Sequence, residues 1–88
     1  MGFMFRKPAA HEAILFPDCR YVHTSFVLGT LDLIFLDAAG AVLRVDERVA
    51  PFQIRGEAKA SAVLEIKGGL WSVMTETERG KLILAARL

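Results

Sequence analysis

The chain has few of the residues that usually build a covalent or metal-bound site. Its 88 residues include one cysteine, two histidines and three prolines. With Cys19 alone, no intrachain disulfide can form, so an oxidising compartment is neither required nor excluded. His11 and His23 stand in no Cys-x-x-Cys or His-x-x-x-His spacing. We therefore expect neither a structural zinc site nor any other metal or cofactor.

The chain also lacks an excess of one charge and a long apolar run. Eleven basic and ten acidic residues are scattered along it, which argues against a nucleic acid or an anionic membrane as partner. Residues 26–36, the longest apolar stretch, contain Asp32 and fall far short of the roughly 20 residues of a membrane-spanning helix. Residues 8–16 are too polar for a signal peptide. We expect a cytoplasmic protein, exported only if its true N-terminus lies upstream.

What the chain does contain is an alternating apolar pattern. Hydrophobic residues make up 53% of it, enough for one core and a single domain over residues 1–88. Residues 31–36 read Leu-Asp-Leu-Ile-Phe-Leu, which is typical of a central strand covered on both faces. Asp37-Ala38-Ala39-Gly40 then supplies the Asp and Gly of a hairpin turn into a strand over residues 42–49.

Other segments predict the rest of the fold. Strands are expected over residues 13–16, 20–28 and 58–66, with Glu65 facing outward, and residues 52–56 lead into a loop. Leu70, Trp71 and Met74 recur at helical spacing, and we interpret residues 82–86 as a closing strand. The sequence thus predicts an α+β fold that is mainly β, with an antiparallel sheet rolled towards a small barrel and one short helix near the C-terminus.

Several segments together resemble one known family. Residues 2–6, Gly-Phe-Met-Phe-Arg, are similar to the Gly-Leu-Met-Phe-Arg segment of the bacterial and archaeal DUF192 family, and residues 19–24, Cys-Arg-Tyr-Val-His-Thr, to its Cys-Arg-x-Val-His-Thr variant. The resemblance continues through residues 31–37, 40–45 and 62–66. It implies a β-rich domain without an established biochemical function. The family pattern normally begins with a further strand and helix; without them a sheet edge stays open, which predicts self-association.

Asp32 is the residue that the apolar pattern leaves unexplained. A carboxylate within a central strand has to be hydrogen-bonded, paired or protonated. One interpretation is structural: an ion pair, or a carboxylate that accepts main-chain amides or the Thr24 or Thr30 hydroxyl. The other is a ligand pocket in which the carboxylate orients a polar ligand and a nearby cation binds an anionic group. That pocket would be formed by Arg20, His23, Thr24 and Asp32.

Cys19, His23 and Asp32 also supply the residue types of a thiol nucleophile, a base and an orienting carboxylate. On an extended strand Cys19 and His23 would lie roughly 13 Å apart, so catalysis would require a bend or bulge between them. The alternative for Cys19 is a half-buried, inert thiol. We therefore expect a non-enzymatic binding or accessory domain for a small polar ligand or a protein. A small hydrolytic or thiol-dependent enzyme is the alternative function.

Overall fold

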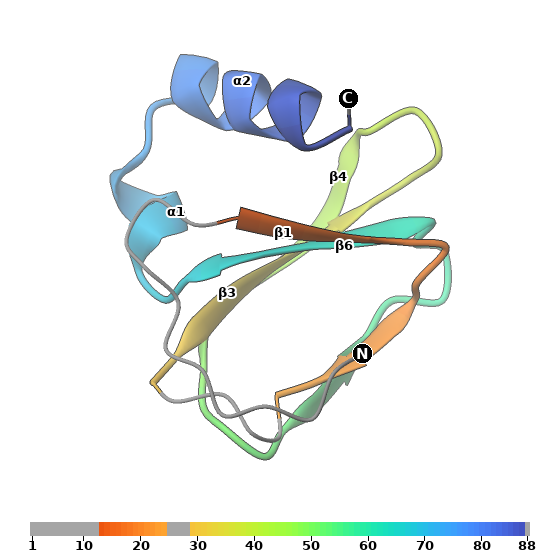
Figure 1. The fold of residues 1–88 in the computed structure, drawn as a ribbon, viewed down its shortest axis with the longest axis vertical. Helices are drawn as coiled ribbons and strands as arrows, with labels where there is room; N and C mark the ends of the chain where they lie inside the picture. Colours follow the sequence, from red (N-terminus) through yellow and green to blue (C-terminus); the bar gives the residue numbers. More distant parts are fainter. Residues whose placement is uncertain (1–12, 25–28, 88) are drawn as a thin grey trace.

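The computed structural model describes residues 13–24 and 29–87 (Figure 1). The predicted family segment of residues 2–6, His11, and residues 25–28 of the predicted second strand lie outside this part. The strands and helices are β1 (Ala13–Pro17), β2 (Tyr21–His23), β3 (Leu31–Leu36), β4 (Val42–Val49), β5 (Ile54–Gly56), β6 (Ala62–Lys67), α1 (Leu70–Val73) and α2 (Glu76–Arg87). In the described residues, no helix is long and apolar enough to cross a membrane.

The strands form two antiparallel sheets. The larger has the order β1-β6-β3-β4, and β2 pairs with β5 in a separate two-stranded ribbon. Figure 1 shows α2 on one side of the larger sheet and the ribbon on the other. The α+β, mainly β fold is confirmed, but the larger sheet is not closed into a barrel. Its outer strands are β1 and β4, and self-association through an edge stays a prediction that sedimentation velocity can check.

Strand β3 lies in the middle of this layered structure and is buried along its whole length. Its odd-numbered residues face the ribbon, in a cluster made up of Val22, Leu31, Leu33, Phe35, Val49, Ala60 and Val63. Its even-numbered apolar residues face the helices, in a second cluster made up of Ile34, Leu36, Leu64, Ile66 and Trp71. The predicted central strand is therefore confirmed, because each face of β3 has its own apolar covering.

The hairpin between β3 and β4 forms where the sequence predicts it. One carboxylate oxygen of Asp37 accepts the amides of Ala39 and Ala41, each at 2.9 Å. Gly40 has a φ of 87°, in the left-handed region that glycine adopts without a steric penalty. The Asp–Gly spacing therefore predicts this turn, because Asp37 accepts the amides of the turn and Gly40 adopts the left-handed conformation that the turn requires.

Three sequence predictions differ from the structure. Residues 54–56 form strand β5 rather than a loop. Strand β6 begins at Ala62, and Glu65 is buried rather than outward-facing, because β6 lies inside the sheet with Ile14 of β1 and Leu33 of β3 flanking this position. Residues 82–86 belong to helix α2 and not to a closing strand; Leu82, Ile83 and Ala86 pack on the helix-facing side of the sheet, as positions one turn apart on a helix do.

Helix α2 begins with a reciprocal cap that explains why this segment is helical. The Thr75 amide donates to the Glu78 carboxylate at 2.8 Å, and the Glu78 amide donates to the Thr75 hydroxyl at 3.1 Å. Such a capping box satisfies amides that the first turn leaves unpaired. The Arg79 guanidinium then donates to the Trp71 carbonyl at 3.0 and 2.6 Å and lies 4.6 Å from the centre of the Trp71 ring. This contact fixes α2 to α1.

The capping box predicts a pH dependence of folding. Hydrogen bonds from the Thr75 amide and hydroxyl hold the pKa of Glu78 below its ordinary value of 4.5. A carboxyl whose pKa is lower in the folded state stabilises the fold above its unfolded pKa, and this contribution is lost as pH falls through the folded pKa. In acid titrations of urea-unfolding midpoints, Glu78→Gln should show a shallower loss of stability below the ordinary pKa than the wild type. Glu76→Gln removes an acidic side chain from the same turn and is the matched control, against which the effect of Glu78→Gln is judged.

Candidate functional site

The Asp32 carboxylate lies on the helix-facing side of β3 and is fully buried. One oxygen accepts the amides of Arg48, at 2.8 Å, and Gly69, at 3.0 Å. The other oxygen accepts the amide of Trp71 at 2.8 Å. A carboxylate that receives three main-chain hydrogen bonds is satisfied without a cation.

Local backbone geometry presents these amides to Asp32. The pairing of β3 with β4 shifts between Leu31 and Leu33, so that two residues of β4 lie opposite Asp32 in a β-bulge. Arg48 in this bulge has a φ of 53°, and Gly69 before α1 has a φ of 88°. Both left-handed residues turn their amides out of the regular ladder and towards the carboxylate. Asp32 therefore holds the bulge and the start of α1 together.

The structure does not assemble the predicted cluster of Arg20, His23 and Asp32. Arg20 directly precedes β2, and His23 pairs with Ile54 in the ribbon. The ribbon covers the opposite face of the sheet from α1 and Asp32. Since the buried sheet separates the two sides, Asp32 is not in position to orient His23 or a ligand held by Arg20.

Thr24 has a structural environment at the end of β2. It is 1% exposed, and its hydroxyl donates to the Ala50 carbonyl at 2.7 Å and accepts the Gln53 amide at 2.9 Å. These bonds hold the turn around Phe52, whose φ of 63° is unusual for a bulky residue. The Thr24 hydroxyl thus uses its donor and an acceptor site within the fold.

Cys19 is half-buried and packs against the ribbon-facing core cluster. Its thiol donates to the Tyr21 carbonyl at 3.1 Å. Because the sulfur is packed and its hydrogen is engaged, we expect iodoacetamide to alkylate Cys19 much more slowly in the folded protein at neutral pH than in urea. Equal rates in the two conditions would instead favour the thiol-dependent enzyme, and mass spectrometry measures both.

Arg20 borders a pocket of about 350 Å³ together with Asp18, Ala60 and Ser61. Asp18 has a φ of 53°, a conformation that Asp tolerates better than most residues. Within the described part of the chain, the side chains of Asp18, Arg20 and Ser61 form no hydrogen bond or ion pair. The pocket is therefore lined by a carboxylate, a guanidinium and a hydroxyl that are not bonded within the described part of the chain.

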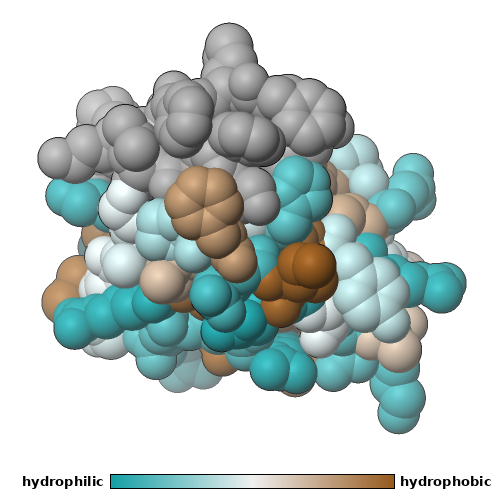
Figure 2. Space-filling view, turned by 90° about the horizontal axis from the view of Figure 1, so that it is seen from below, coloured by the Kyte–Doolittle hydropathy of each residue, from teal (hydrophilic) through white to brown (hydrophobic). Residues whose placement is uncertain are grey.

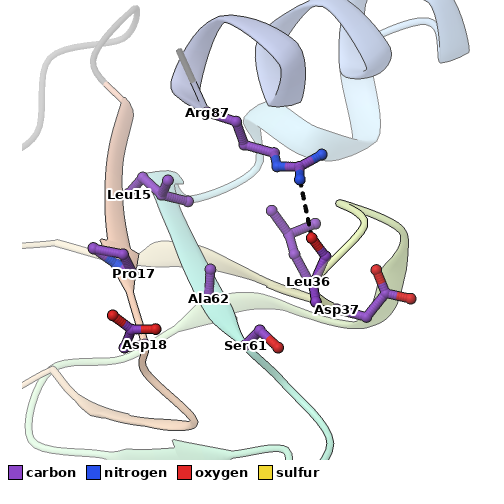
Figure 3. Close-up of a pocket in the computed structure, with 9 residues that line it drawn as sticks. Leu15, Pro17, Asp18, Leu36, Asp37, Ser61, Ala62 and Arg87 are labelled. Carbon is purple, nitrogen blue, oxygen red and sulfur yellow. Dashed lines mark hydrogen bonds between the residues drawn. The ribbon is translucent and has the colours of Figure 1, made fainter.

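A second pocket of about 340 Å³ adjoins the first, because Asp18 and Ser61 line both. It lies where the ends of β1 and β3 meet the start of β6, below the C-terminal end of α2 (Figure 3). Its apolar walls come from Leu15, Pro17, Leu36 and Ala62. The two pockets together form the candidate site.

Comparison with known proteins places the chain in a family. The sequence model of DUF192, described as an uncharacterized ACR, matches residues 1–83. The chain belongs to the DUF192 family. The resemblance seen in the sequence is thereby confirmed. No curated protein matches this DUF192 chain.

A solved structure is similar to this DUF192 domain. It is a crystal structure of a protein of unknown function from Novosphingobium aromaticivorans DSM 12444, with 29% sequence identity and a TM-score of 0.69. The similarity covers 81% of the present chain and 56% of the other. The DUF192 domain thus spans just over half the length of that protein.

A third, larger groove, of about 560 Å³, lies between β4 and β5 and contains three arginines. Two of them contact the carboxylate of Asp46, which accepts a hydrogen bond from Arg44 at 2.7 Å and lies 3.7 Å from the Arg55 guanidinium. The same Asp46 carboxylate raises the pKa of Arg44. Asp46 therefore engages two of the three guanidinium groups of this groove, and Glu47 adds a second carboxylate to its lining.

The ribbon side of the DUF192 domain carries large exposed side chains, Tyr21, Phe52 and Ile54. Figure 2 looks onto this side and shows hydrophobic groups separated by hydrophilic ones in the coloured part of the surface. Scattered exposed apolar residues are ordinary on soluble domains. They do not by themselves mark a partner. Among the described residues there is also no group of three His, Cys, Asp or Glu side chains that could hold a metal ion.

Proposed function

We propose that this DUF192 domain is a non-enzymatic binding domain that holds a small polar ligand through an anionic group of that ligand at Arg20. The observation that carries the proposal is the Arg20 guanidinium, which borders a pocket and has no partner among the described residues. A planar guanidinium with unused donors binds carboxylates and phosphates through paired, charge-assisted hydrogen bonds. Arg20 therefore supplies the main attraction for an anion.

The surroundings of Arg20 support this role. Ser61 offers a hydroxyl on the same pocket, and a hydroxyl can donate to an anion beside the guanidinium. The Arg20 carbonyl accepts the Glu57 amide at 3.0 Å and the Cys19 amide donates to the Ser61 carbonyl, so the main chain on both sides of the pocket is fixed. The pocket volume of about 350 Å³ falls within the range of about 300–1,000 Å³ typical of small-molecule sites.

The proposal predicts that acetate and inorganic phosphate bind at this pocket. In NMR titrations of ¹⁵N-labelled protein, both anions should shift the amides of residues 18–20 and 60–61, and Arg20→Gln should weaken the binding at least about tenfold. Lys67→Gln is the matched control: it removes one positive charge at the far end of β6, where Lys67 is exposed, and should leave the affinity unchanged.

Two results would contradict the proposal. One is the absence of shifts at these amides in the presence of either anion. The other is an equal loss of affinity in Arg20→Gln and Lys67→Gln, since this would mean that net charge, rather than the Arg20 guanidinium, governs the binding.

A further inference from the structure

We infer, on the basis of the proposed function, that the ligand is a zwitterionic α-amino acid with an apolar side chain. Its carboxylate would bind Arg20, its ammonium group would bind Asp18, and its side chain would enter the adjoining pocket below α2. The inference rests on the arrangement of one cation, one anion and one apolar pocket around residues that the two pockets share.

The shared lining of the two pockets is the first step. Asp18 and Ser61 line both, with Arg20 on one side and the apolar walls on the other. A single small molecule that touches both Arg20 and Leu15 would therefore lie against Asp18 and Ser61.

The charges are the second step. Asp18 and Arg20 line the same pocket but form no ion pair with each other. A simple anion bound at Arg20 would be repelled by the nearby Asp18 carboxylate, whereas a ligand that carries both charges would be attracted by both side chains. The pocket therefore favours a zwitterion over an anion of the same shape.

The apolar pocket is the third step; its Arg87 and Asp37 side chains are already engaged, and Figure 3 shows one of the hydrogen bonds of the Arg87 guanidinium. The Arg87 guanidinium donates to the carbonyls of Ala39, at 2.7 Å, and Ala38, at 3.0 Å. One carboxylate oxygen of Asp37 accepts two amides of the β3–β4 turn. What remains available to a ligand is the apolar wall of Leu15 and its neighbours, which suits an aliphatic side chain.

Three related probes test the inference: L-leucine; 4-methylpentanoate, which lacks only the amino group; and 3-methylbutylamine, which lacks only the carboxylate. In the same NMR titrations, leucine should bind at least about tenfold more tightly than either of the others. Glycine, which lacks the side chain, should also bind more weakly and should leave the amides around Leu15 and Ala62 unshifted.

Two variants separate the roles of the charged residues. Arg20→Gln should weaken leucine and 4-methylpentanoate alike. Asp18→Asn should weaken leucine but not 4-methylpentanoate, so that the two probes bind about equally. Because Asn adopts the left-handed conformation of residue 18 as readily as Asp, this variant should fold normally. Lys67→Gln again serves as the control for a change of net charge.

The outcomes distinguish the two proposals. If 4-methylpentanoate binds as tightly as leucine and depends on Arg20, the anion site stands and the amino acid inference is overturned. If glycine binds as tightly as leucine, the apolar pocket has no role and the inference is likewise overturned. If none of the probes, acetate or phosphate binds in an Arg20-dependent manner, the proposed function itself fails.

Discussion

Replacing Asp32 with alanine should lower the free energy of unfolding by about 3–5 kcal/mol. The three amides of Arg48, Gly69 and Trp71 would lose their acceptor, and a buried donor left unsatisfied costs about 1–3 kcal/mol. A small domain has only about 5–15 kcal/mol of stability in total. Asp32→Ala should therefore shift the urea midpoint strongly at an unchanged m-value, or leave the domain unfolded at room temperature.

Asp37→Ala is the matched control for this experiment. Asp37 also accepts main-chain amides, but these bonds are exposed, so water can replace the carboxylate and the loss should be about 1 kcal/mol. Asp32→Asn should lose an intermediate amount of stability. Its side-chain NH2 group is a donor and would face at least one of the three main-chain amides, which are also donors. An Asp32→Ala variant as stable as Asp37→Ala would refute the structural role of the buried carboxylate.

Gly68→Ala should destabilise the domain by about 1–3 kcal/mol. A Cβ at this position would overlap the Thr30 hydroxyl and would lie 2.9 Å from the Thr30 carbonyl carbon. The Gly68 amide also donates to the Thr30 carbonyl at 2.9 Å, so the main chains cannot separate without losing that bond. The effect should appear as a lower thermal midpoint.

Gly80→Ala is the opposite control. Gly80 lies inside α2, and nothing lies within 4 Å of the position that its Cβ would occupy. Alanine there should stabilise the helix by about 0.5–1 kcal/mol, because glycine loses more conformational entropy on folding. Equal effects of the two substitutions would show that the contact at Thr30 is not tight.

The central strand and its hairpin could be predicted from local sequence because their signals are complete within a few residues. The continuous apolar pattern of residues 31–36 requires covering on both faces, and Asp37 and Gly40 define their turn by themselves. The covering of each face, in contrast, comes from residues far away along the chain. The pattern therefore predicts that both faces are covered but not by which elements.

The end of the chain was mispredicted because a short apolar run fits a strand or a helix equally well. The deciding signal lies upstream of residues 82–86, in Thr75 and Glu78, which have the spacing of a capping box. Reading this pair would have identified α2. Strand β5 gave no comparable signal, since its three residues are defined by pairing with β2.

The candidate site was only partly predictable. Arg20 was singled out in the sequence as a cation for a ligand, and it does border a pocket. No sequence signal groups Asp18 or Ser61 with Arg20, because their proximity arises where β1 ends and β6 begins. For Asp32 the sequence predicts a need for donors, with main-chain amides among the candidates, but it does not predict which amides, because every residue except proline carries one and no sequence pattern distinguishes them.

The shared acceptor at Asp32 also affects how the domain opens. The β4 bulge and the start of α1 are far apart in sequence, yet both depend on one side chain for a hydrogen bond. A fluctuation that frees either segment weakens the anchoring of the other, so the two segments behave as one cooperative unit. Through Arg79 on the Trp71 carbonyl, α2 is coupled to that unit as well.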